Sequence, residues 1–503
     1  MTIKITEEVH KIFGSPGTGK TTYLLNIVDK ELTNGTSSRR MGYFSFTRKA
    51  ATEARDRAIT KFPQLNAKTD FPFFRTLHSL AFYCLGIKTE SIMQAEHFKE
   101  FAEQAGIQLS LMTEDHIVKA DNPILNEINI ARIRGIDLHD HYNQSNMSIE
   151  WHHFEFVERT YRHYKTVNSL FDFTDLLEMI VAAPTYMPFL DVLIIDEAQD
   201  LSLLQWRMVD LLSQRSKRVY IAGDDDQAIF VWAGADVKSF LSAAGTVTVL
   251  KQSHRIPSSV HKLADTVVQR IHERQPKNWS PRDFEGIVKT YRRFEDVNIN
   301  DQEWLILAST NYMLNPIHEW LKSNGVLFER GGVPSLAPTI VSAVMEWERL
   351  RKGQAIDGRS VRNIYKYLDT SGVARGNKLF KTGQETELYT LDVLREKHGL
   401  LTDAIWHEAL TKIAEDKRTY LLSVLRRGTK LSDVRRIRLS TIHGAKGGEA
   451  DHVLLFMDLS PKFAKEYSRD ADNVHRLFYV GITRAKEGLH LVLPRFTDKG
   501  FRL

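Results

Sequence analysis

With 503 residues, of which 42% are hydrophobic and 26% charged, the chain has the composition of a globular protein with room for roughly two to four domains. A formal charge of +5 permits a polyanionic partner without requiring one, while the single cysteine, Cys84, excludes internal disulfides and a cysteine-based zinc site. The N-terminus lacks the apolar core of a signal peptide, and no run approaches the ~18–20 apolar residues of a membrane span, so we expect a cytoplasmic protein without a membrane partner.

The first element is a short strand that runs into a glycine-rich turn and the start of a helix. It fits the pattern G-x-x-x-x-G-K-T without a mismatch. The candidate nucleotide-binding residues are Gly14, Ser15, Pro16, Gly17, Thr18, Gly19, Lys20, Thr21 and Thr22. Glycines let backbone amides approach phosphate oxygens, and the helix N-terminus adds a favourable dipole. Lys20 would reach the β- and γ-phosphates and Thr21 would hold Mg²⁺, which predicts a nucleotide motor or switch.

Strand and helix patterns alternate along most of the chain, which predicts parallel sheets covered by helices. Further strands are expected at 41–45, 192–195, 218–222, 246–250, 304–308, 326–329, 437–439, 453–456 and 489–493. Helices are expected at 48–61, 76–85, 203–214, 258–271, 311–322 and 474–483. Strand-like runs disappear between 86 and 169, and a second mostly helical block lies at 335–435. The pattern indicates two α/β cores, each with a helical insertion.

Two other features of these insertions allow more than one interpretation. Histidines gather between 139 and 163, but without the ligand spacing of a metal site, so a solvated polar face is the better explanation. The Lys and Arg residues of 335–435 are typical of either an ordinary surface or a binding face.

Carboxylates follow the apolar run 192–195 directly, at Asp196 and Glu197. Ligands of open α/β sheets lie at the carboxyl ends of strands. Asp196 would therefore coordinate Mg²⁺ opposite Thr21, and Glu197 would orient and deprotonate the attacking water. The alternative is a strand that simply ends in a polar turn.

The next strand leads to Gln227, which would sense a γ-phosphate, and then to Phe230 and Trp232. Aromatic side chains near a phosphate sensor suit a protein that stacks nucleic-acid bases and reports their presence to its nucleotide site. The alternative is that both aromatic side chains are packed in the core.

The glycine-rich loop, the Asp196–Glu197 pair and the segment 227–232 follow one another along the chain. In this order they resemble the motifs of the superfamily 1 helicases of the UvrD/Rep/PcrA type. Further matching motifs lie at 46–51, 75–79, 172–177, 252–255, 310–311, 329–332, 440–449 and 479–486. The resemblance implies an α/β fold with two RecA-like parallel-sheet motor domains, each interrupted by a mostly helical insertion. The first core is expected at 1–85 and 170–255 with its insertion at 86–169, and the second at 256–334 and 436–503 with its insertion at 335–435.

The resemblance also implies roles for residues of the second core. Arg255 and Arg484 would act as arginine fingers on the γ-phosphate, both delivered by the second core, so that the site is complete only when the cores close on ATP. Glu449 would contact the ribose, and His254 would stack on the base. For either arginine, the alternative role is a surface salt bridge.

DNA would lie across both cores. The expected contacts are Phe46, Thr76, His78, Phe230, Trp232, Thr441, His443 and Lys446. Stacking carries little base preference, so we expect little sequence specificity. His78 and His443 have an alternative role as hydrogen-bonded links between motifs.

The chain departs from the family pattern in three ways. Only nine residues precede His10, so no upstream glutamine that reads adenine is expected. His254 stands where the family usually has a tyrosine, and imidazole stacks more weakly. The second insertion is shorter than the corresponding subdomain of the family. The family's unwinding strength and its regulation by partners therefore cannot be assumed for this chain.

The leading hypothesis is an ATP-dependent DNA helicase that uses Mg²⁺, moves 3′ to 5′ on single-stranded DNA and opens duplexes at single-strand/double-strand junctions. It is expected to be monomeric, with replication or repair proteins as possible binding partners. The alternatives are a translocase that strips proteins from DNA and a DNA-binding scaffold without hydrolysis. The presence of every expected catalytic residue argues against the scaffold. A combined helicase and nuclease is also disfavoured, because no carboxylate cluster typical of a nuclease follows Arg484.

Overall fold

The computed structural model describes residues 8–45, 48–114, 117–145, 147–299, 302–376, 385–431, 436–496 and 499–503. The chain divides into two compact units. Unit 1 comprises Met1–Glu285 and Glu466–Tyr479, and unit 2 comprises Gly286–Lys465 and Val480–Leu503. Each unit is built on a sheet of its own.

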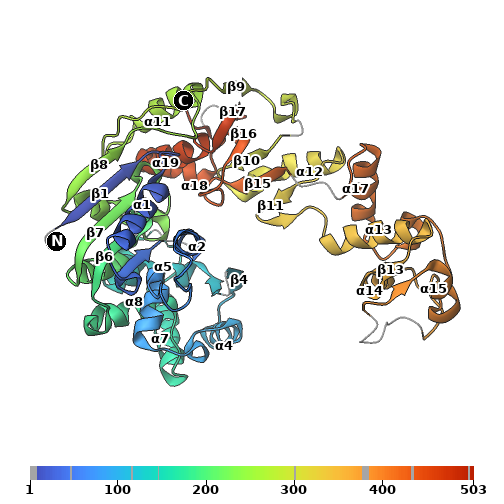
Figure 1. The fold of residues 1–503 in the computed structure, drawn as a ribbon, viewed down its shortest axis with the longest axis horizontal. Coiled ribbons are helices and arrows are strands. Elements are labelled where there is room, and N and C mark those ends of the chain that lie inside the picture. Colours follow the sequence, from blue (N-terminus) through green and yellow to red (C-terminus); the bar gives the residue numbers. More distant parts are fainter. Residues whose placement is uncertain are drawn as a thin grey trace. The chain divides into compact units, whose positions relative to one another are not determined.

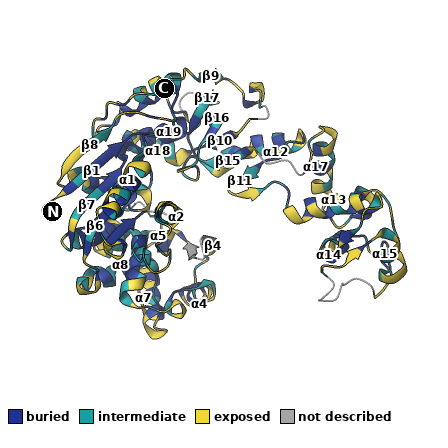
Figure 2. Cartoon of the chain, viewed as in Figure 1, coloured by how far each residue is buried: buried dark blue, intermediate teal, exposed yellow. Residues whose placement is uncertain are grey.

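The sheet of unit 1 has the strand order β3-β2-β6-β7-β1-β8, and its described pairs are parallel (Figure 1). Its strands are β1 Val9–Gly14, β2 Met41–Phe44, β3 Phe74–Arg75, β6 Leu190–Ile195, β7 Ser216–Gly223 and β8 Thr246–Leu250. The central strand β6 is apolar on both faces, as expected of a parallel strand covered on both sides, and it is buried (Figure 2). Because the strands run in parallel, the segments that follow β1, β6 and β7 meet at one edge of the sheet.

Helices of unit 1 lie between and after these strands. They are α1 Lys20–Thr33, α2 Arg48–Lys61, α3 Leu77–Leu85, α8 Phe173–Ala182, α9 Leu203–Ser213, α10 Val237–Ser242, α11 Ser258–Val268 and the first part of α19 Ala471–Ile482. Short 3₁₀ turns follow the strands at η4 Ala198–Asp200, η5 Asp225–Gln227 and η6 Val231–Ala233. Thr76, Asp172 and Ser202 cap the starts of α3, α8 and α9 by accepting backbone N–H groups.

The insertion of unit 1 consists of α4 Ala95–Ala105, β4 Ser110–Glu114, β5 Ile117–Asp121, α5 Pro123–Arg134, α6 Leu138–Gln144 and α7 Trp151–Val167. The expectation that strands are absent from 86–169 is wrong, because β4 and β5 pair as an antiparallel hairpin. The sequence signal was present: Ile117 and Val118 are β-branched residues, which favour strands.

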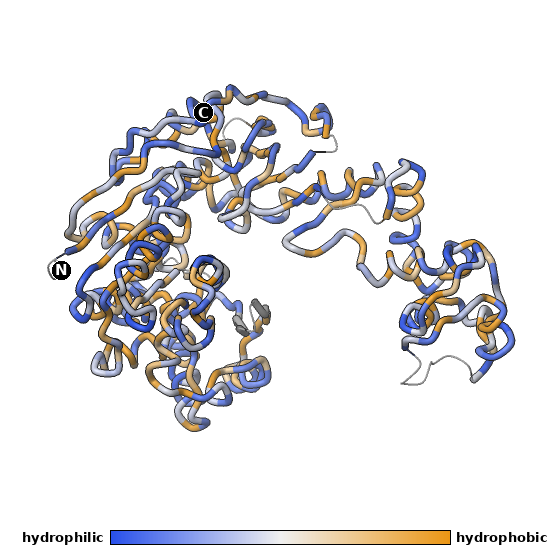
Figure 3. The backbone as a smooth tube through the Cα atoms, viewed as in Figure 1, coloured by the Kyte–Doolittle hydropathy of each residue, from blue (hydrophilic) through white to orange (hydrophobic). Residues whose placement is uncertain are grey.

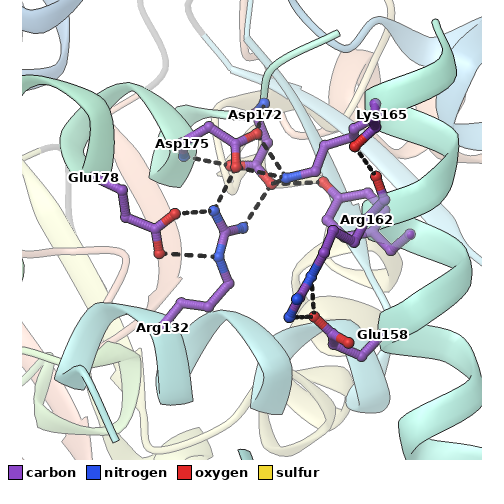
Figure 4. A network of polar contacts seen from close by, with 9 residues as sticks. Arg132, Glu158, Arg162, Lys165, Asp172, Asp175 and Glu178 are labelled. Atoms are coloured by element: carbon purple, nitrogen blue, oxygen red, sulfur yellow. Dashed lines mark hydrogen bonds and ion pairs between the residues drawn. The ribbon is translucent and has the colours of Figure 1, made fainter. Parts of the chain in front are cut away.

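A network of ion pairs joins this insertion to α8 (Figure 4). Its members are Arg132 of α5, Lys165 of α7, and Asp172, Asp175 and Glu178 at the start of and along α8; beside it, Arg162 pairs with Glu158. Arg132 Nη1 lies 2.8 Å from Asp172 Oδ2, and Lys165 Nζ lies 2.7 Å from the same oxygen. Burial alone would raise the pKa of Asp172, but Arg132 and Lys165 hold it below its ordinary value. Because loss of Arg132 or Lys165 would leave the buried Asp172 with less compensating charge, the network holds α5 and α7 against the start of α8.

The sheet of unit 2 has the order β12-β11-β15-β10-β16-β17-β9, with β11 and β12 antiparallel and the other described pairs parallel. Its strands are β9 Ile287–Tyr291, β10 Trp304–Ala308, β11 Glu329–Arg330, β12 Val333–Pro334, β15 Ile437–Thr441, β16 Ala450–Phe456 and β17 Ala485–Val492. Central strands such as β10 and β16 are strongly hydrophobic (Figure 3). The sequence pattern missed β9, which is an edge strand with an exposed first residue, Ile287.

The helical part of unit 2 shares one continuous core with this sheet. Its elements are η8 Asn311–Leu314, α12 Asn315–Ser323, α13 Pro338–Arg351, α14 Gly358–Tyr367, α15 Leu391–His398, α16 Trp406–Ala409, α17 Glu415–Arg426, part of α18 Pro461–Arg469, and the short pair β13 Ile356–Asp357 and β14 Leu388–Tyr389. Buried tryptophans Trp304, Trp347 and Trp406 belong to this core. Across the described ranges, the helices are too short or too polar to cross a lipid bilayer.

A buried histidine pair in unit 2 makes its stability sensitive to acid. His452 Nδ1 lies 3.2 Å from His490 Nε2, and Trp304 stacks on His452. Burial lowers the pKa of both histidines, that of His490 to about 4. The unfolded chain therefore binds protons that the folded chain does not, and stability is lost as the pH falls from about 6.5 towards 4.

We expect the free energy of unfolding to fall by about 2 kcal/mol more in the parent chain than in His490→Gln when the pH is lowered from 7.5 to 5. Urea unfolding followed by tryptophan fluorescence at both pH values measures the difference. An equal loss in the two chains would show that His490 does not contribute to the acid sensitivity.

Candidate nucleotide-binding site

The loop between β1 and α1 has the backbone of a phosphate cradle. Gly17 and Gly19 have φ of 75° and 79°, a conformation that side chains disfavour. A Cβ at Gly14 would lie 2.5 Å from Thr18 Oγ1, so only glycine fits where the chain leaves the strand. Helix α1 begins at Lys20, whose Nζ donates to the Gly14 carbonyl at 2.7 Å. The loop thus ends at the N-terminus of a helix, where an anion is favoured.

Asp196 lies opposite Thr21, as the sequence pattern predicts. Strand pairing brings it there, because the Asp196 amide donates to the Phe44 carbonyl at the end of β2. Thr21 Oγ1 is 3.4 Å from Asp196 Oδ2, and that oxygen also accepts a 2.8 Å hydrogen bond from the Tyr43 hydroxyl. Burial, together with the neighbouring charge of Glu197, raises the pKa of Asp196 to about 6.

Thr21 and Asp196 suit a magnesium ion. Both supply hard oxygen atoms, and Mg²⁺ is usually held by one or two protein oxygens while substrate phosphates and water complete its shell. Among the described residues, this site included, no group of three or more His, Cys, Asp or Glu side chains could hold a metal. The two oxygens of Thr21 and Asp196 therefore fit an ion whose remaining ligands come from a nucleotide and water.

Glu197 leads into a chain of hydrogen bonds that ends at Gln227. Gln199 Nε2 donates to Glu197 Oε2 at 2.5 Å, and Gln199 Oε1 accepts from the Asp224 amide at 2.9 Å. Asp224 Oδ2 in turn accepts from Gln227 Nε2 at 2.6 Å. Glu197 itself adopts a φ of 55°, which is unusual for a side-chain-bearing residue. The expected base and the expected phosphate sensor are thus linked through Gln199 and Asp224. Gln199 follows Glu197 by two residues but was not among the predicted site residues.

A buried lysine pairs with all three carboxylates of the acidic turn before Gln227. Lys277 Nζ lies 2.5 Å from Asp225 Oδ1, 2.8 Å from Asp226 Oδ2 and 3.2 Å from Asp224 Oδ1. Arg274 adds two hydrogen bonds of 2.8 Å to Asp226. Burial alone would lower the pKa of Lys277, but Asp224, Asp226 and Asp225 raise it above its ordinary value. Lys277 could not be identified from the sequence pattern, because nothing near it in the sequence indicates that it is buried.

Residues 252–255 lie directly against the phosphate loop within unit 1. Ser253 Oγ donates to the Pro16 carbonyl at 2.8 Å, and the His254 amide donates to the Gly17 carbonyl at 2.9 Å. A Cβ at Gly17 would lie 2.5 Å from Arg255 Cβ. The expectation that Arg255 is delivered by the second core is therefore wrong: strand β8 leads the chain straight back to the loop, so Arg255 belongs to the same unit as Lys20.

The other expected finger, Arg484, and Glu449 belong to unit 2. Arg484 is buried, and its Nε donates to the Val480 carbonyl at 2.9 Å. The alternative prediction that Arg484 forms a surface salt bridge is therefore wrong. The Glu449 carbonyl accepts from Arg438 Nη2 at 2.6 Å, and the Glu449 side chain is half-buried.

The expected DNA contacts in unit 1 differ in exposure. Trp232 in η6 is 59% exposed, so the alternative prediction that it packs in the core is wrong. Phe230 is half-buried. Thr76 Oγ1 accepts the Ser79 amide at 3.2 Å, and His78 meets Phe173 edge to face. Phe46 lies outside the described residues.

The expected DNA contacts in unit 2 follow β15. Thr441 Oγ1 accepts the Gly444 amide at 3.1 Å, and His443 stacks on Phe463. The Lys446 amide donates to the His443 carbonyl, which closes a tight turn. The three expected contacts are partly exposed.

Comparisons with known proteins agree with these motifs. Residues 2–248 match the family described as the UvrD/REP helicase N-terminal domain, and residues 436–492 match the UvrD-like helicase C-terminal domain. A probable DNA helicase of Mycoplasma pneumoniae is 25% identical over 65% of this chain and 64% of its own. The ATP-dependent DNA helicases PcrA of Leuconostoc citreum and Rep of Buchnera aphidicola are 24% and 25% identical, over 73% and 60% of this chain and 51% and 47% of their own. The chain thus spans about half to two thirds of the length of these relatives.

Proposed function

The chain belongs to the UvrD/REP helicase family, and on this premise we propose that it hydrolyses ATP to move 3′ to 5′ along single-stranded DNA and to unwind duplexes. The observation that carries the proposal is the cluster in unit 1: Thr21 and Asp196 face each other beside the phosphate loop, and Glu197 is linked to Gln227. Relatives named ATP-dependent DNA helicases support it.

The residues of the cluster divide the work of phosphoryl transfer. Lys20 would place its charge on the β- and γ-phosphates, where negative charge develops. Glu197, held by Gln199, would orient and deprotonate the attacking water. Gln227 would contact the γ-phosphate and exchange its bond to Asp224 for one to the nucleotide. Mg²⁺, held by Thr21 and Asp196, would neutralise charge between the phosphates.

Further roles belong to the same proposal. Arg255, and Arg484 from the second motor core, would stabilise charge on the transferred phosphoryl group, and Glu449 and His254 would contact the ribose and base. His254 is exposed, which suits stacking. The division into motor cores at 1–85 with 170–255 and at 256–334 with 436–503 also belongs to the proposal.

Strand displacement tests the function and its polarity. A duplex with a 3′ single-stranded tail should be unwound in the presence of ATP, while one with a 5′ tail should not. Repeating the assay with each nucleoside triphosphate would show how strictly adenine is required. Faster ATP hydrolysis on adding single-stranded DNA but no strand displacement would indicate a translocase, and no increase in hydrolysis would refute the motor.

Trp232→Ala should uncouple hydrolysis from DNA. Loss of one stacking contact costs ~1–3 kcal/mol, which weakens single-stranded DNA binding by roughly 5- to 150-fold. ATPase assays with and without single-stranded DNA, together with fluorescence anisotropy of labelled DNA, measure both effects. Tyr186→Ala is the matched control, because Tyr186 is an exposed aromatic residue of unit 1 outside the expected DNA contacts. Unchanged stimulation by DNA in Trp232→Ala would exclude the stacking role.

A further inference from the structure

Tyr43 carries a buried hydroxyl that core packing does not require. Its side chain is fully buried in β2, and its ring stacks on Phe74 with centroids 5.6 Å apart. The other residues of this strand are Met41, Gly42 and Phe44, so phenylalanine would satisfy the packing equally well. A buried hydroxyl is costly unless it is hydrogen-bonded, and the partner of Tyr43 is a carboxylate of the nucleotide site, Asp196.

The sheet register sets this contact. Strands β2 and β6 pair Tyr43 with Ile194 and Phe44 with Ile195, which places Asp196 one residue beyond the paired segment. The Tyr43 hydroxyl then reaches Asp196 Oδ2 at 2.8 Å. The contact therefore joins a residue of β2 to the first residue after β6.

Both oxygens of Asp196 are held in place. Oδ1 accepts the Glu197 amide at 2.9 Å, while Oδ2 accepts from Tyr43 and lies 3.4 Å from Thr21 Oγ1. Without the Tyr43 hydroxyl, the carboxylate would keep one backbone hydrogen bond and could rotate Oδ2 away from Thr21. Partners of this kind typically tune the affinity of a metal site by 10- to 100-fold.

We infer that Tyr43 is a positioning residue for the metal-binding carboxylate: its hydroxyl holds Asp196 Oδ2 towards Thr21, ready to share a Mg²⁺ ion brought by a nucleotide. The inference rests on the proposed function, because it assumes that Thr21 and Asp196 hold that ion. It adds a residue that does not itself touch the metal or the nucleotide.

Tyr43→Phe tests the inference in the 503-residue chain, with Mn²⁺ as the probe. Electron paramagnetic resonance of free Mn²⁺ in the presence of ADP gives the metal affinity, and a fluorescent ADP analogue in EDTA gives metal-free nucleotide binding. We expect Mn²⁺ to bind about 10-fold more weakly in the variant, with nucleotide binding in EDTA unchanged within about 2-fold. In ATPase assays the Mg²⁺ concentration for half-maximal rate should rise, while the rate at saturating Mg²⁺ recovers.

Tyr161→Phe is the matched control, because the buried Tyr161 hydroxyl also donates to an aspartate, Asp172, at 2.9 Å. That aspartate belongs to the ion-pair network of Figure 4 and not to the nucleotide site. It should leave Mn²⁺ affinity unchanged even if it lowers thermal stability as much as Tyr43→Phe does. Equal or tighter Mn²⁺ binding in Tyr43→Phe than in the parent would overturn the inference and leave the proposed function intact. Absence of Mn²⁺-dependent ADP binding in the parent would overturn both.

Discussion

Lys20→Ala is expected to lower the rate of ATP hydrolysis by about 10²- to 10³-fold, while the affinity for single-stranded DNA changes by no more than about 3-fold. Lys20 begins α1, and its Nζ is held at the Gly14 carbonyl, at the mouth of the phosphate loop. A fixed cation where charge develops in the transition state commonly contributes a factor of this size. Steady-state ATPase assays at saturating single-stranded DNA and anisotropy of labelled DNA measure the two effects.

Lys30→Ala is a suitable control for this variant. Lys30 lies in the last turn of the same helix and is exposed, so its replacement removes one positive charge without touching the phosphate loop. Both activities should stay near those of the parent. If Lys20→Ala lost DNA binding as severely as hydrolysis, Lys20 would be supporting the fold of unit 1 rather than the phosphates.

The sequence predicts the site well where its residues are close together in the chain. The phosphate loop and the Asp196–Glu197 pair follow strands directly, and a parallel sheet brings such segments to one edge. The approach of Asp196 to Thr21 was thus predictable from pattern alone. The exposure of Trp232 was less certain, since an aromatic residue next to Phe230 fits a core as readily as a surface.

Contacts between distant segments could not be predicted in this way. In the sequence, Tyr43 is an ordinary strand residue. Only the register between β2 and β6 shows that its hydroxyl reaches Asp196. Arg255 was assigned to the wrong core because its motif resembles the start of the second one, whereas β8 returns the chain to the phosphate loop. Lys277 lies 51 to 53 residues from its carboxylate partners, and no local pattern relates them.

Lys277→Met is expected to destabilise unit 1 by about 3–5 kcal/mol, because removing one member of a buried ion cluster leaves uncompensated charge in the protein interior. The Lys277 side chain and those of Asp224 and Asp225 are fully buried, so water cannot replace the lost partner. Chemical unfolding of the purified 503-residue chain gives the loss. Lys262→Met is the matched control: Lys262 is exposed on α11 and should change stability by less than about 0.5 kcal/mol.

The pH dependence of this loss distinguishes a charge effect from a packing effect. Without Lys277, Arg274 would still pair with Asp226, but the buried carboxylates should acquire raised pKa values, since burial favours their neutral form. A carboxyl group whose pKa is raised in the folded state binds more protons there than in the unfolded chain, so acid stabilises the fold through that group. The deficit of Lys277→Met relative to the parent should therefore narrow between pH 7.5 and 5. A deficit that stays constant with pH would show that Lys277 contributes by filling space, and that the acidic turn before Gln227 does not depend on its charge.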